Sequence, residues 1–66
     1  MVAVTETTGM RVRIERVRRG LTQEQLARVA DVAQYDVSMV ERNRPIPEAR
    51  QKRIQGALDL EAKGVG

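Results

Sequence analysis

Five side chains between residues 34 and 42 carry chemistry suited to recognition. They are an amide, a phenol, a hydroxyl, a thioether and a guanidinium, carried by Gln34, Tyr35, Ser38, Met39 and Arg42. At about 100° per residue of an α-helix, they fall within an arc of roughly 140°. Such groups hydrogen-bond base edges or touch thymine methyl groups in a major groove, which is wide enough to admit a helix. We call these five residues the reading strip and interpret it as a surface for duplex DNA.

The opposite side of the same segment is apolar. Val40 and Val37 lie at about 240° and 300° when Gln34 is set at zero, which predicts that the two valines anchor the helix in a core. A solvated face is more often built from Glu, Lys and Arg at i, i+4 spacing. Taken singly, Tyr35 and Met39 are more often packing residues than recognition residues. Their position opposite the two valines favours recognition.

Two helices joined by a tight turn are expected to position the reading strip. Thr22 can cap the first of them, and Gln25, three residues later, completes a capping box. Asp31 tolerates the left-handed backbone that a short helix–helix turn often requires. The second helix is expected from about residue 34 to residue 42, where Asn43 can end it. The first is expected to face the core through Leu26, Ala27, Val29 and Ala30.

Two further helices complete the expected fold. One spans residues 10–19 and ends at Gly20, a natural residue for a left-handed terminal position. The other runs from Pro47, a favourable first helical residue, to about Leu60. Residues 1–9 are expected to form a flexible arm and residues 63–66 a frayed tail. The prediction is therefore one all-α domain over residues 10–62, with the two-helix motif at about 22–42.

Composition narrows the function classes. The chain has 66 residues without Cys or His, which argues against a disulfide framework, a metal site, a cofactor and an enzyme. It also lacks an apolar run of the roughly 18 residues that span a bilayer, so we expect a cytoplasmic protein. Ten Arg against two Lys favour bidentate contacts with phosphate over a merely solvated surface.

The segment Leu21-Thr-Gln-Glu-Gln-Leu-Ala, then Val32 and Val37-Ser-x-Val-Glu-Arg-Asn, resembles the phage repressor/Cro (XRE-like) helix-turn-helix family. The resemblance covers roughly residues 11–60 and implies a small four- to five-helix DNA-binding domain. It places Gln34, Tyr35, Ser38 and Met39 at base-reading positions. Phosphate contacts are implied for Thr22, Gln23, Arg42, Asn43 and Arg44.

The resemblance also implies structural roles. Gln23 would brace the recognition helix as well as contact a phosphate, and Arg16 would form an internal salt bridge with Glu41. Near the C-terminus the short segment replaces two helices of longer family members, which leaves the dimer surface open. Residues that would form that surface, or the core, are Ile54, Leu58 and Leu60.

Besides this shortened segment, two positions depart from the family pattern. Asp31 replaces a frequent turn Gly, and Ala33 replaces the frequent Ser or Thr cap of the recognition helix. Losing that cap costs about 1 kcal/mol. Asp36 is expected near the reading strip, where it would repel phosphate or accept a hydrogen bond from cytosine N4.

Two functions remain open from the sequence. One is a transcriptional regulator, most simply a repressor, that binds a pseudo-palindromic operator in double-stranded DNA as a homodimer. The other is an antitoxin or phage-encoded adaptor, in which Tyr35 and Met39 anchor a protein partner such as a toxin, polymerase or other phage or host factor.

Overall fold

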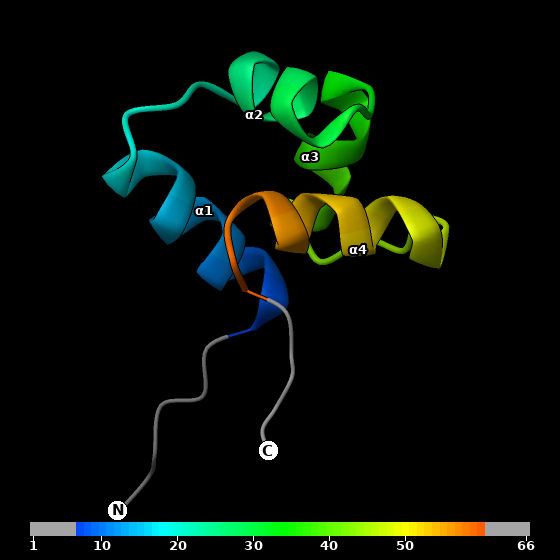
Figure 1. The fold of residues 1–66 in the computed structure, drawn as a ribbon. Coiled ribbons are helices and arrows are strands. Elements are labelled where there is room, and N and C mark those ends of the chain that lie inside the picture. Colours follow the sequence, from blue (N-terminus) through cyan, green and yellow to red (C-terminus); the bar gives the residue numbers. More distant parts are fainter. Residues whose placement is uncertain (1–6, 61–66) are drawn as a thin grey trace, which may run out of the picture.

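The computed structural model describes residues 7–60, which form an all-α domain of four helices (Figure 1). They are α1 (Thr8–Arg18), α2 (Gln23–Ala30), α3 (Gln34–Glu41) and α4 (Glu48–Ala57). This confirms the fold class predicted from the sequence. Over the described residues, none of the helices has the length and apolar character needed to cross a bilayer.

Helix α1 begins earlier than predicted. Thr7 is its N-cap, and the Thr7 hydroxyl accepts a hydrogen bond of 3.1 Å from the amide of Met10. Thr8 and Gly9 are therefore helical, and assigning them to an arm over residues 1–9 was wrong. The capping preference of Thr was the overlooked signal. Residues 1–6 of the expected arm, and the expected tail at 63–66, lie outside the described residues.

All four helices end in the same way. In each, a residue with positive φ follows the last helical turn, and the amide after it donates back to a carbonyl five residues earlier, a pattern that satisfies the free carbonyls of a helix end. The left-handed residues are Gly20, Asp31, Asn43 and Asp59. The first three were identified from the sequence as helix-ending positions. The residues that follow them are Leu21, Val32, Arg44 and Leu60.

The core is small and entirely aliphatic. All four helices contribute to it, and its buried members are Val12, Leu26, Ala27, Ala30, Val37, Val40, Ile54 and Leu58. Around it pack partly buried side chains, which include Leu21, Val32 and Leu60. Ile54 and Leu58 therefore belong to the core and cannot form a dimer surface, while Leu60 is only half-buried at its edge.

One predicted core residue is exposed. Val29 on α2 has 63% of its surface exposed, so placing it on the inner face was wrong. The buried Leu26, Ala27 and Ala30 lie within an arc of about 100°, and Val29 falls about 60° outside that arc. A short helix packed against α3 and α4 buries only one side, and Val29 lies beyond it.

Helix α4 is shorter than predicted at both ends. Pro47 is its N-cap instead of its first helical residue, and Leu58 is already the C-cap. Arg19 connects this end to α1, because its guanidinium donates to the carbonyl of Leu58 at 3.2 Å and to Asp59 at 3.3 Å. Hydrogen bonds to Glu15 and then Asp59 raise the pKa of Arg19.

Candidate nucleic-acid interface

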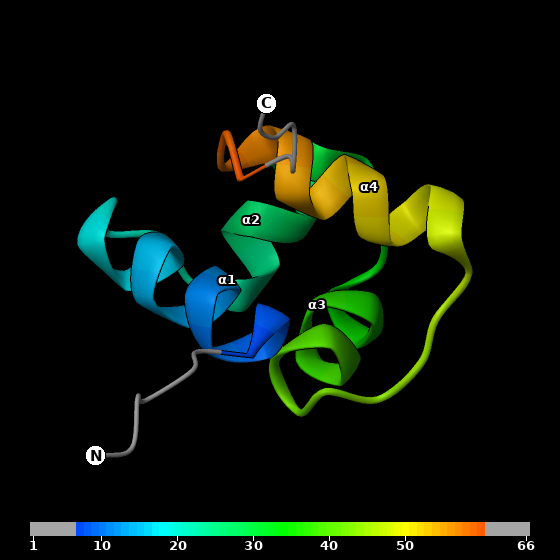
Figure 2. The same ribbon diagram turned by 90° about the horizontal axis from the view of Figure 1, so that it is seen from below.

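Helix α3 buries its valines and exposes the reading strip. Val37 is fully buried and Val40 nearly so, as their spacing predicted. On the other side Gln34 and Arg42 are exposed, Ser38 and Met39 are half-buried, and Tyr35 has 68% of its surface exposed. Figure 2 shows α3 at the edge of the helical bundle, with one side turned away from the other helices. The five side chains therefore lie on an accessible face of the molecule.

The N-terminus of α3 is held by a carboxylate that does not face the reading strip. Ala33 supplies no side-chain cap, but Asp36 accepts a hydrogen bond of 3.1 Å from the amide of Ala33. Asp36 is 4% exposed and also accepts a hydrogen bond of 3.4 Å from the guanidinium of Arg50 on α4. Its expected position near DNA was wrong, because it lies about 200° around α3 from Gln34. Asp36 instead fixes the start of α3 against α4.

The C-terminal half of α3 is held by a buried ion pair. Arg16 of α1 donates from Nε to Glu41 Oε2 at 2.6 Å and from Nη2 to Oε1 at 3.2 Å, so the predicted salt bridge is confirmed with bidentate geometry. The side chain of Glu41 is only 6% exposed. Arg16 also donates to the carbonyl of Leu21 at 2.8 Å. Through Glu41, α3 is locked to α1.

Helix α2 also contacts the carboxylate of Glu41. Gln23 Nε2 donates to Glu41 Oε1 at 3.1 Å, which confirms that Gln23 braces α3. Its amide nitrogen carries a second N–H, so the phosphate contact stays a prediction. The Thr22 hydroxyl accepts a hydrogen bond of 3.0 Å from the amide of Gln25, and the Gln25 side chain accepts one of 2.8 Å from the amide of Thr22. The capping box is confirmed and fixes where α2 begins.

The end of α3 is packed directly on the start of α1. Asn43 Oδ1 accepts a hydrogen bond of 3.0 Å from the amide of Gly9, which is buried. A Cβ on Gly9 would collide with the carbonyl oxygen of Val40 and lie 2.9 Å from that of Glu41. This contact was not found from the sequence, where Gly9 was assigned to the flexible arm. Asn43 thus has a structural role in addition to its expected one at phosphate.

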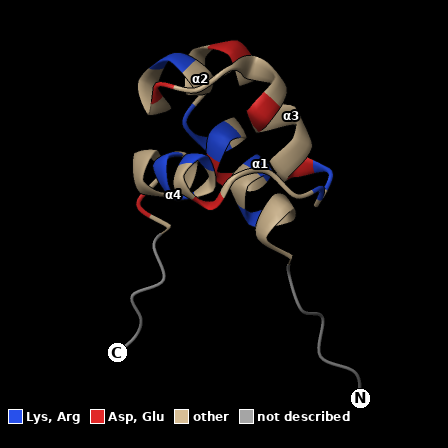
Figure 3. Ribbon diagram, turned by 90° about the vertical axis from the view of Figure 1, so that its right-hand side faces the viewer, with Lys and Arg blue, Asp and Glu red and all other residues tan. Residues whose placement is uncertain are grey.

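Two arginines lie at the end of α3, one as the last residue of the reading strip and one in the loop that follows. Arg42 and Arg44 are exposed, and neither forms an ion pair with an acidic residue in the described part of the chain. Figure 3 shows basic residues at this end of α3. Arg44 follows the left-handed residue Asn43. At the ends of the other three helices the equivalent position holds an apolar residue that packs against the core, namely Leu21, Val32 or Leu60.

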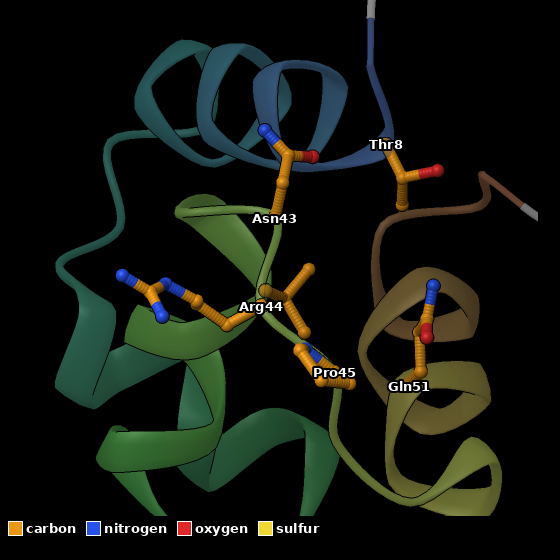
Figure 4. Close-up of a pocket in the computed structure, with 6 residues that line it drawn as sticks. Thr8, Asn43, Arg44, Pro45 and Gln51 are labelled. Carbon is orange, nitrogen blue, oxygen red and sulfur yellow. The ribbon is translucent and has the colours of Figure 1, made fainter.

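A cleft of about 300 Å³ adjoins this loop, between the start of α1 and α4. Figure 4 shows Asn43 directed towards α1. The Arg44 side chain extends in the direction away from Thr8 and Gln51, which line the far side of the cleft. The guanidinium of Arg44 is therefore displayed beside α3 and is not sequestered in the cleft.

No model of a known protein family matches the chain. No curated protein matches it significantly either.

Proposed function

We propose that the chain is a sequence-specific DNA-binding transcriptional regulator that places α3 in the major groove. The observation that carries the proposal is the two-sided character of α3, with buried valines on one side and a partly exposed reading strip on the other. A helix that reads bases must also be held rigidly. Asp36 supplies that rigidity at the start of α3, and Glu41 and Asn43 supply it at the end.

The proposed contacts divide into two classes. Gln34, Tyr35, Ser38 and Met39 supply discrimination at base edges, since an amide pairs well with adenine and apolar groups contact the thymine methyl. Arg42 and Arg44 supply phosphate contacts, which fix register and give salt-dependent affinity. The N-terminus of α2, with Thr22 and Gln23, is proposed to meet a phosphate as well, because helix N-termini attract anions.

The proposed regulator acts through two copies on a pseudo-palindromic operator, with recognition helices about 34 Å apart. It would act in the cytoplasm, at the nucleoid. Its effect would come from occupying DNA and would need no cofactor. Repression by occluding polymerase is the simplest outcome for so small a domain, and an operator beside polymerase would give activation with identical contacts. Since Ile54 and Leu58 are buried in the core, contacts between the copies must use other residues.

Selection of bound sites from random duplex DNA tests the proposal. The expected result is one enriched sequence with two related half-sites about 10–10.5 base pairs apart. Binding to that sequence should persist at about 150 mM salt, where non-specific binding has faded steeply. An unenriched pool, or identical salt dependence for selected and scrambled DNA, would contradict it. That result would favour the adaptor function, in which the exposed Tyr35 anchors a protein partner.

A further inference from the structure

The outer face of α1 carries an apolar stripe that the fold does not use. Met10, Ile14 and Val17 are 46%, 43% and 59% exposed, respectively. Their i, i+4, i+7 spacing brings them together on one side of the helix, within an arc of about 60°. The buried Val12 lies roughly opposite, about 160–220° away. The packing of α1 in the domain is therefore complete without the stripe.

Basic side chains border the stripe on both sides. With Met10 at zero, Arg13 falls at about 300°, and Arg18 and Arg11 fall at about 80° and 100°. All three are exposed. Arg18 pairs with Glu15 at 3.3 Å, whereas Arg11 and Arg13 form no ion pair with the acidic residues of the described segment. The stripe and its three arginines form what we call the α1 face.

We propose that the α1 face docks an acidic, amphipathic segment of another protein. An apolar centre surrounded by charged groups is the anatomy of a protein–protein interface, and Met and Arg are enriched there. The positive charge of the rim selects the partner. Carboxylates on the partner, placed beside its apolar side chains, would form bidentate pairs with the arginines of the α1 face. This inference does not rest on DNA binding, since it uses none of the reading strip.

A second copy of this chain fits the α1 face poorly. Helix α1 contains one acidic residue, Glu15, whose carboxylate already accepts hydrogen bonds from Arg18 and Arg19. A twofold contact would therefore set the arginine rims of both copies against each other without compensating carboxylates. DNA fits poorly too, because the three apolar side chains between the arginines would be held against phosphates.

Two matched helical peptides test the proposal with the full-length protein. Both carry Leu at the same i, i+3, i+4, i+7 positions, flanked by Glu in one peptide and by Lys in the other. In a titration of isotope-labelled protein followed by NMR, the Glu peptide should perturb the amides of α1 and bind at least about tenfold more tightly. Equal binding of the two peptides, or perturbation centred on another helix, would overturn the proposal.

A pair of variants separates the α1 face from general stickiness. Val17→Glu should weaken binding of the Glu peptide by about tenfold or more, whereas Val29→Glu should leave it unchanged. Val29 is the matched control because it is equally apolar and 63% exposed, but lies on α2. Both variants should retain the wild-type Tm. Equal losses of peptide affinity in the two variants would also overturn the proposal. So would sedimentation data that show a wild-type dimer which Val17→Glu dissociates, because the α1 face would then bind a second copy.

Discussion

The amide of Gly9 donates a hydrogen bond of 3.0 Å to the side-chain oxygen of Asn43, 34 residues away in the sequence. This bond joins the first turn of α1 to the residue that ends α3. It lies directly before Arg44, whose proposed partner is a phosphate. The position of that arginine relative to α3 thus depends on how closely α1 approaches.

Gly9→Ala should destabilise the protein by about 1–3 kcal/mol, because the added methyl group would collide with the backbone at the end of α3. In an uncrowded helix the same change would stabilise by about 1 kcal/mol, so the sign of the effect is decisive. Urea denaturation measures it. Thr8→Ala, one residue earlier and exposed, is the control. A Gly9→Ala protein as stable as wild type would show that the two helices are not in close contact.

Glu41→Ala should destabilise the protein by about 3–5 kcal/mol, since it leaves the guanidinium of Arg16 buried without its partner. Replacing the pair together, as Arg16→Met with Glu41→Leu, should recover much of the loss because no unpaired charge remains. Thermal unfolding of the two proteins provides the comparison. Equal destabilisation of both would mean that the ion pair is not the source of the effect.

Leu58→Asp should unfold the monomer, because it places a carboxylate in the aliphatic core. A domain of this size has a stability of only about 3–10 kcal/mol, so one buried charge is enough. Leu60→Asp, at the half-buried edge of the core, should cost less. Circular dichroism distinguishes these outcomes. A folded Leu58→Asp protein that had merely lost self-association would place Leu58 on an interface instead.

Arg42→Ala and Arg44→Ala should each weaken DNA binding by a similar factor for every sequence tested. Each should also reduce the slope of log affinity against log salt by about one unit, because one phosphate contact is lost. Fluorescence anisotropy at several salt concentrations gives the slope. Arg28→Ala is the control, since Arg28 pairs with Glu24 on α2. A slope unchanged in all three variants would remove both arginines from the proposed interface.

Local signals predicted much of this structure. The capping box at Thr22, the left-handed Gly20 and Asp31, and the buried valines of α3 all follow from short-range chemistry. The Arg16–Glu41 pair is different, because only the family resemblance linked two residues 25 positions apart.

Two features were missed because they depend on tertiary contacts. Position 9 needs a glycine because α1 closely approaches the end of α3, a requirement that appears only when the two helices are packed. Val29 is apolar yet exposed, since no neighbouring helix covers its side of α2. Asp36 could have been assigned correctly, because an acidic residue three positions after an uncapped helix start can bond back to the free amide.

Base discrimination by Gln34 is the most direct test of the proposed function. Affinities of wild type and Gln34→Ala should be measured for an operator and for every single-base variant of one half-site. The proposal predicts a loss of about 1–3 kcal/mol that disappears at one base position, with the free energy of unfolding unchanged. A parallel set with Tyr35→Ala should identify a different position. Uniform losses across all variants, or wild-type affinity in both proteins, would contradict recognition of bases by this face of α3.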